Sequence, residues 1–444
     1  MRKFSYPQSF ETFYNDLIPK IEMQSLIYDR ERVYKENSLF ARNLSILKVS
    51  SKILLLIFKS FKYIFASSNN SIDEICLFFD LTRQFLVPTH MNEKDLELFF
   101  EKDFVERLNF KYKKIVIVGN ESYNNLYPKL HFTKSYTKYL FTGKISLAQI
   151  IRILYFFPII FIKLFNKNDF RIIAYDLIEI ALSLNLFTDN SNSSFIITNS
   201  SLDQLPSVFY IKKQFRAFET VCLLYSENNF LITNTQNISF SPESDLVLKN
   251  FFIDKLFTWT NEYKSFLEKY NSSSKIYSCG SIMFKHKHNV LASNLKKTVT
   301  IFDIIPSINE SIVSLTHIQF SLEFLDEILE LKKLMIKFEK DSEIKIKHSR
   351  RLIPSHHLEY IRKLQSLKND RILSEVPYNS SVYELVQQSI LVICSIGTSP
   401  ALIAREYGIP VAYLCTSSNV FPGPVNYNIP TLKSGADLYN LYIK

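Results

Sequence analysis

Short apolar runs alternate with longer amphipathic stretches along the second half of the chain. Strands are predicted where β-branched and aromatic residues cluster, at 255–259, 275–279, 299–305, 343–347 and 371–373. Helices are predicted between them, at 261–270, 317–340, 355–367 and 381–388. Strands that alternate with helices are typical of a parallel sheet covered by helices. We therefore predict a Rossmann-like unit from about residue 246 to residue 444.

The first half of the chain repeats this succession less regularly. Strand-like runs occur at 75–81, 114–118, 194–199 and 220–225, with a helical stretch at 204–216. Ser, Asn and Pro gather at 234–245, which marks the expected boundary. A chain of 444 residues is long enough for two domains with their own cores. We predict the α/β class, with two Rossmann-like domains at 1–245 and 246–444 whose strands point into a central cleft.

The segment 391–414 has the most informative pattern. It reads as a buried strand, a short Ser/Gly/Thr turn, a helix that stops at Gly408, and a second buried strand. Gly397 lets a ligand approach the backbone closely, and Ser395, Thr398 and Ser399 place hydroxyls at the start of the helix. A helix N-terminus has unpaired N–H groups and a partial positive charge, so this turn is a candidate phosphate site. The alternative is an ordinary strand–helix–strand unit with no ligand.

Two further segments are expected near that turn. A basic stretch follows the strand at 343–347 and contains Lys347, His348, Arg350 and Arg351. A histidine with basic neighbours can hold a nucleotide phosphate and stabilise the charge on a departing phosphate. The loop at 374–381, with Pro377 and Tyr378, is a candidate contact for a base or ribose. A solvated basic surface loop is the alternative for the first segment.

Charge and composition limit the classes of ligand and partner that we expect the protein to bind. The net charge of +10 favours anionic ligands or an anionic membrane face, whereas no nucleic-acid-binding motif is present. No Asp-x-Asp motif occurs, so a metal-dependent sugar-nucleotide site of that kind is not expected. We expect no cofactor. The five cysteines have no metal or redox spacing, which suits reduced core residues in the cytoplasm.

The N-terminal residues 1–16 do not resemble a signal peptide, and no apolar run is long enough to span a bilayer. Segments 46–65 and 149–167 nevertheless mix Lys or Arg with large apolar side chains, as helices that lie in a membrane interface do. We expect a cytoplasmic protein that attaches to the inner face of the cytoplasmic membrane. Core helices with a basic edge are the alternative reading of both segments.

The second half of the chain resembles the C-terminal domain of GT-B-fold glycosyltransferases. The resemblance rests on Trp259, Gly280, the Lys-x-Lys-His motif ending at His348, and the SIGTSP and GIPV motifs of 395–400 and 408–411. It is most similar to the bacterial capsule and lipopolysaccharide group, which includes sialyltransferases, Kdo transferases and CDP-glycerol glycerophosphotransferases. In that group, a His-Pro motif and a Ser/Thr-rich motif hold the phosphate of a cytidine nucleotide. Here His348 is followed by Ser349 instead of Pro, and Ala401 stands where many GT-B enzymes have a ribose-binding Glu.

The resemblance implies a metal-independent transfer of a sugar, from a CMP-linked nonulosonic acid or Kdo donor, to a surface-polysaccharide or lipid-linked acceptor. The general base for an inverting transfer should be a carboxylate that follows a strand of the N-terminal domain. Asp203 and Glu227 are the principal candidates, and Glu121 and Asp80 are further ones. Capping or surface roles are the alternative for each. A polyol-phosphate transferase, a nucleotide-sugar epimerase and an inactive partner subunit stay open as alternative functions.

Overall fold

The computed structural model describes four strands of the first half and most of the chain from residue 219 to residue 443. The described residues are 75–80, 114–118, 131–133, 195–200, 219–224, 227, 230–232, 253–270, 274–281, 298–304, 306, 318–348, 357–377, 380–416, 420–422 and 425–443. Segments 46–65 and 149–167 lie outside them.

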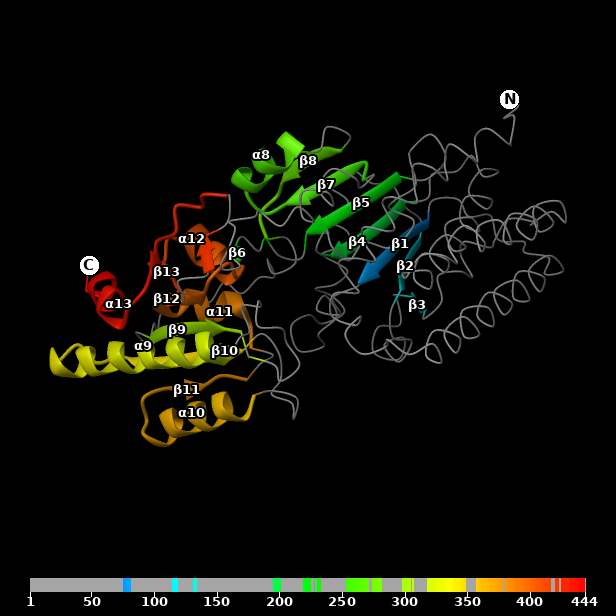
Figure 1. Ribbon diagram of the computed structural model, residues 1–444. Helices are drawn as coiled ribbons and strands as arrows, with labels where there is room; N and C mark the ends of the chain where they lie inside the picture. The colour runs from blue at the N-terminus through cyan, green and yellow to red at the C-terminus, as the bar shows by residue number, and fades with distance from the viewer. Residues whose placement is uncertain are drawn as a thin grey trace, which may run out of the picture.

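The first sheet has seven parallel strands (Figure 1). Their order is β3-β2-β1-β4-β5-β7-β8, so the strand order reverses between β1 and β4. The strands are β1 (Ile75–Asp80), β2 (Lys114–Val118), β3 (His131–Thr133), β4 (Phe195–Ser200), β5 (Glu219–Leu224), β7 (Lys255–Thr258) and β8 (Lys275–Ser278). Helix α8 (Asn261–Tyr270) connects the last two strands.

The second sheet has six parallel strands in the order β11-β10-β9-β12-β13-β15. The strands are β9 (Thr298–Asp303), β10 (Glu343–His348), β11 (Ser374–Glu375), β12 (Ser389–Ser395), β13 (Val411–Leu414) and β15 (Thr431–Leu432). The helices of this unit are α9 (Ile318–Lys337), α10 (Leu358–Asn369), α11 (Val382–Gln387), α12 (Pro400–Glu406) and α13 (Gly435–Tyr442). The order reverses between β9 and β12, which makes this sheet doubly wound as well.

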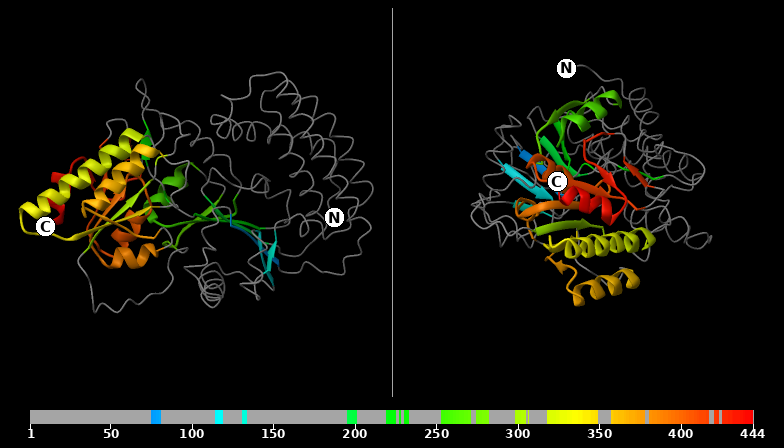
Figure 2. Two further views of the ribbon diagram at one scale, coloured as in Figure 1. Left: turned by 90° about the horizontal axis from the view of Figure 1, so that it is seen from below. Right: turned by 90° about the vertical axis from the view of Figure 1, so that its left-hand side faces the viewer.

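The core of the second unit follows from strand periodicity. Along β12, Leu391 and Ile393 pack on one face with α9, α10 and α13, whereas Val392 and Cys394 pack on the other face with α11 and α12. Figure 2 shows α9 and α13 running side by side on their face of the sheet. The close approach requires Gly435, because a Cβ there would lie 2.5 Å from the carbonyl oxygen of Glu327.

The predicted α/β class, with two successive Rossmann-like parallel sheets, is confirmed. The division between the sheets differs from the expected boundary at 245/246. Strands β7 and β8 were expected to open the second unit, but β7 pairs with β5, with Leu256 opposite Cys222. The indole Nε1 of Trp259 also donates to the carbonyl oxygen of Leu224, at 2.8 Å. The two sheets therefore divide between β8 and β9, in the chain interval 279–297.

A short antiparallel ribbon pairs a segment that follows β5 of the first sheet with a segment that follows β13 of the second. It pairs β6 (Phe230–Ile232) with β14 (Val420–Pro422). Among the helices that the structure describes, none has both the length and the apolar character needed to cross a bilayer.

Candidate functional site

A buried polar cluster lies at the carboxyl end of the second sheet. Asp303, His348 and Ser395 are the last residues of β9, β10 and β12, which are neighbouring strands in the order β10-β9-β12. Tyr360 of α10 completes the cluster from the adjoining helical layer. Ligands of doubly wound sheets bind beyond the strand ends at the point where the strand order reverses, which here is the β9/β12 junction. The sequence motifs at His348 and Ser395 therefore meet at one sheet edge.

Asp303 is the centre of this cluster. Its Oδ1 accepts hydrogen bonds from the Ser395 hydroxyl at 2.9 Å and from the N–H of Ile304 at 2.7 Å, and its Oδ2 accepts one from the Tyr360 hydroxyl at 2.5 Å. Burial raises the pKa of Asp303 to about 6, against the opposing effect of these hydrogen bonds. The carboxylate is therefore mostly ionised at neutral pH and bridges β9 to β12.

His348 lies beside Asp303 and is almost fully buried, with 2% of its surface exposed. Its Nδ1 is 3.5 Å from the Tyr360 hydroxyl, and its Nε2 is 4.0 Å from Oε1 of Glu375. Glu375 is held in turn by Lys368, with 2.7 Å between Nζ and Oε2. The ring thus has a fixed position between the end of the sheet and α10.

Lys347 brings a second cationic group to the end of β10. Its Nζ donates to the carbonyl oxygen of His348 at 3.3 Å, and the side chain is 7% exposed. Burial lowers the pKa of Lys347 to about 8. The amine is consequently mostly protonated at neutral pH, and a bound anion would stabilise its positive charge.

The turn between β12 and α12 has the geometry that the sequence suggested. Gly397 has a φ of 74°, in the left-handed region that favours glycine. The Thr398 hydroxyl donates to the carbonyl oxygen of Ser395 at 2.8 Å and closes the turn. The buried Ser399 hydroxyl has no hydrogen-bond partner among the described residues. Of the three predicted hydroxyls, those of Ser395 and Thr398 stabilise the protein itself, whereas that of Ser399 takes part in no hydrogen bond with the described residues.

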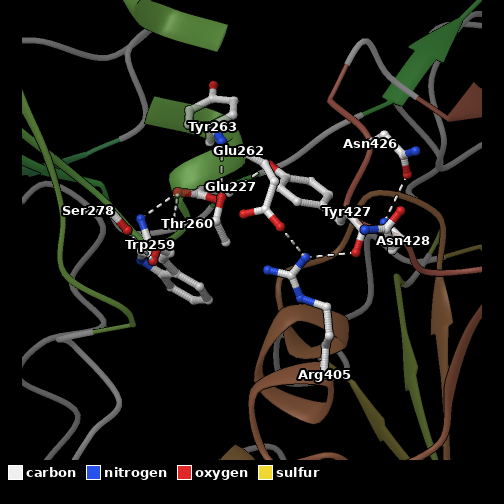
Figure 3. A network of polar contacts seen from close by, with 10 residues as sticks. All are labelled: Glu227, Trp259, Thr260, Glu262, Tyr263, Ser278, Arg405, Asn426, Tyr427 and Asn428. Carbon is white, nitrogen blue, oxygen red and sulfur yellow. Dashed lines mark hydrogen bonds and ion pairs between the residues drawn. The ribbon is translucent and has the colours of Figure 1, made fainter. Parts of the chain in front are cut away.

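Glu227 is buried between the two units (Figure 3). Its Oε1 accepts from the N–H groups of Trp259 and Thr260, and its Oε2 accepts from the Thr260 hydroxyl at 2.7 Å and the Tyr427 hydroxyl at 3.3 Å. Burial raises the pKa of Glu227 to about 7, although all four hydrogen bonds lower it. Because four donors already occupy its oxygens, the geometry favours a structural role at the start of α8.

The other predicted residues are placed as follows. Pro377 is exposed just after β11, and its carbonyl oxygen accepts from the N–H of Ser380 at 2.9 Å. Asp203, Glu121, Arg350, Arg351 and Tyr378 lie outside the described residues, as does the side chain of Asp80. Sequence reasoning missed Asp303 and Tyr360. A carboxylate inside the apolar run 299–305 was the available signal for the first, whereas Tyr360 looked like an ordinary apolar helix position.

A cavity of about 740 Å³ opens beyond the carboxyl ends of β7 and β8. Its wall on the first unit includes Trp259, Glu262 and Tyr277, and its wall on the second unit is formed by Leu402, Arg405 and Glu406 of α12. Arg405 spans the two walls, since its Nη1 lies 2.7 Å from Oε1 of Glu262 and 2.7 Å from the carbonyl oxygen of Tyr427 (Figure 3).

Several solved structures are similar to this chain at low identity. The wall teichoic acid polymerase TagF is 10% identical with a TM-score of 0.45, over 91% of this chain and 89% of TagF. Alr3699/HepE of Anabaena, solved with UDP-glucose, is 10% identical with a TM-score of 0.42, over 83% and 89% of the two chains. TarM of S. aureus is 13% identical with a TM-score of 0.37, over 59% of this chain, and the match spans only about half of TarM.

A comparison with curated proteins gave no match. The model of one protein family does match, over residues 176–438, which is more than half of the chain. The matched residues contain β4, β5, β7 and β8 of the first sheet and every strand of the second. This chain belongs to the family of polysaccharide biosynthesis PFTS motif proteins.

Proposed function

We propose that this protein is a metal-independent glycosyltransferase of polysaccharide biosynthesis that uses a CMP-activated donor, such as a nonulosonic acid or Kdo. The observation that carries the proposal is the polar cluster of Asp303, His348 and Ser395 at the β9/β12 junction, beside the turn that begins α12. Membership of the PFTS motif family supports a role in polysaccharide biosynthesis. The cluster supports the binding of a nucleotide.

The donor would bind with its phosphate at the turn. The Ser399 hydroxyl donates to a phosphate oxygen, and Lys347 and His348 stabilise the negative charge. The loop that contains Pro377 and Tyr378 contacts the base or ribose. Asp303 positions the Ser395 end of β12 and does not touch the phosphate itself, because its oxygens already accept three hydrogen bonds.

The transfer itself would break one bond and form another at the anomeric carbon of the sugar. The acceptor hydroxyl attacks this carbon, and the bond to the phosphate oxygen breaks with its electron pair leaving on the nucleotide. A general base takes the acceptor proton, and Asp203 remains the candidate for this role. The acceptor is a glycan or a lipid-linked saccharide.

We expect cytidine nucleotides to raise the melting temperature in the presence of EDTA. A ligand that binds only the folded state stabilises it by about 2.7 kcal/mol at a hundredfold excess over Kd. CMP or CDP should shift the melt more than UDP or ADP does, which differential scanning fluorimetry measures. A larger shift with UDP would contradict the CMP-linked donor and indicate a UDP-linked donor instead. If no nucleotide shifts the melt, the protein is not a nucleotide-sugar transferase.

Ser399→Ala supplies the matched variant for this test. The hydroxyl has no partner among the described residues, so its removal should leave the melting temperature of the unliganded protein unchanged while it reduces the CMP shift. Gly397→Val is less informative, because a β-branched residue is strained at a φ of 74° even without a ligand. An undiminished CMP shift in Ser399→Ala would argue against the turn as the phosphate site.

We also propose that the protein is cytoplasmic and attaches to anionic lipid through segments 46–65 and 149–167, which combine basic and large apolar residues. Each basic residue near an anionic surface contributes about 1 kcal/mol at low salt, and salt screens this attraction. Co-sedimentation with phosphatidylserine vesicles should therefore decrease as salt is raised. Equal binding to neutral vesicles, or no binding, contradicts the proposal.

A further inference from the structure

The cavity beyond β7 and β8 has an aromatic floor that the proposed donor site does not use. Tyr277 lines the cavity and is 40% exposed, and its ring stacks on Phe257 with 5.1 Å between centroids and 17° between planes. The two residues are directly opposite each other on neighbouring strands. Phe257 is buried and packs against one face of the Tyr277 ring. The Tyr277 side chain is thereby fixed where it lines the cavity, and 40% of it stays exposed.

Hydrogen-bonding groups surround this floor. Glu262 lies in the first turn of α8 on one wall, and Glu406 ends α12 on the other. Partial burial raises the pKa of Glu262, but the hydrogen bond from Arg405, the hydrogen bond from the N–H of Glu262 itself and the charge of Arg405 together outweigh it and lower the pKa. The carboxylate is therefore charged at neutral pH and accepts hydrogen bonds. Asn261 adds an amide at the same rim.

An exposed aromatic face within a ring of acceptors matches the chemistry of a pyranose. One face of a pyranose ring carries C–H groups that pack on an aromatic ring, and its hydroxyls point outward to polar partners. Glu262 and Glu406 outnumber the one cation of the lining, Arg405, and this excess of negative charge disfavours a sugar that has its own carboxylate. This preference is opposite to that of the cationic donor site at Lys347 and His348.

We infer that this cavity binds a neutral pyranose by stacking on Tyr277, with its hydroxyls bound by Glu262 and Glu406. We assign that pyranose to the acceptor polysaccharide, and this assignment rests on the proposed function. The site lies between the two units, since Tyr277 belongs to the first sheet and Glu406 to α12 of the second. Binding there would use both units at once.

The chain itself provides the reporter for a test without catalysis. Trp259 is the single tryptophan of the sequence and lines the cavity. We would titrate the full chain with methyl β-glucoside, methyl β-galactoside and N-acetylglucosamine, and follow tryptophan fluorescence. Glucuronic acid serves as the charged probe and ribitol as the polyol without a ring. No nucleotide is added, so this titration is independent of the donor-binding test.

Saturable binding of at least one neutral pyranose is expected, with glucuronic acid at least tenfold weaker and ribitol without effect. Tyr277→Ala should weaken binding by at least tenfold, whereas Tyr277→Phe should keep it because the aromatic face remains. Phe338→Ala is the matched control, since Phe338 is 51% exposed and stacks on Tyr439 of α13, away from the cavity lining.

Absence of saturable binding by all three neutral sugars overturns the inference, as does an equal response to ribitol. An unchanged affinity in a Tyr277→Ala protein that melts normally also overturns it. A CMP melting shift combined with no sugar binding would leave the proposed transferase standing and remove only the pyranose site. Sugar binding without any nucleotide shift would keep the site and remove the transferase proposal.

Discussion

His348→Ala is expected to lower the turnover of sugar transfer by about a hundredfold or more, which is the usual effect of losing a group that stabilises charge on a leaving phosphate. His348 ends β10 beside Asp303 and Tyr360, where the proposed phosphate site lies. The loss should appear in kcat, measured with a CMP-linked sugar donor and a glycan acceptor.

Two variants separate this effect from damage to the fold. His348→Gln keeps the bulk and a hydrogen-bonding group but cannot become cationic, so it should melt normally and still be slow. Lys345→Ala removes a cation from the same strand, where Lys345 pairs with Glu343 at 3.7 Å, and should retain turnover within about twofold. Unchanged kcat in a folded His348→Ala protein would contradict the role of the histidine.

Glu227→Ala is expected to destabilise the fold by about 3 kcal/mol or more. It would leave the buried N–H groups of Trp259 and Thr260 and the hydroxyls of Thr260 and Tyr427 without their acceptor. Glu268→Ala on the exposed side of α8 is the control, and its effect should stay within about 0.5 kcal/mol. Denaturant unfolding measures both. A stable but inactive Glu227→Ala protein would instead support Glu227 as the general base.

The raised pKa of Glu227 also predicts a pH dependence. The unfolded chain loses this proton near pH 4.5, whereas the folded protein keeps it until about pH 7. The folded state binds more protons between these values, so stability should fall by about 3 kcal/mol as the pH rises through this window. Glu227→Gln, which cannot ionise, should remove that part of the fall. An identical pH profile in both proteins would contradict the assignment.

The sequence was sufficient to predict two parallel sheets but not the division between them. Apolar periodicity is local, so it located β7 and β8 correctly. Which sheet a strand joins depends on distant pairing, here between Lys255 and Val221. The Ser- and Asn-rich segment 234–245 looked like a boundary because loops have the same composition wherever they occur.

The candidate phosphate turn could be proposed from the sequence because its local pattern is unusual. Gly397 and its neighbouring hydroxyls stood out in a chain with only seven glycines. Asp303 and Tyr360 did not stand out, because the residues next to each of them in sequence are ordinary. Their role depends on the hydrogen bond between them, and they are 57 positions apart. The four hydrogen bonds that Glu227 accepts could not be predicted from the sequence either, because one of the donors, Tyr427, follows 200 residues later.

The contacts of the segment that includes β14 and Tyr427 limit where this protein could be joined to a relative in a chimera. That segment comes near the end of the chain, yet it pairs with β6 and reaches Glu227, both of which follow strands of the first sheet. During synthesis, the surroundings of Glu227 stay incomplete until residue 427 has left the ribosome. In a chimera with a junction at 282–297, the first unit would come from one protein and residues 420–427, which contact it, would come from the other. Exchange between relatives should succeed only when residues 420–427 travel with the first unit.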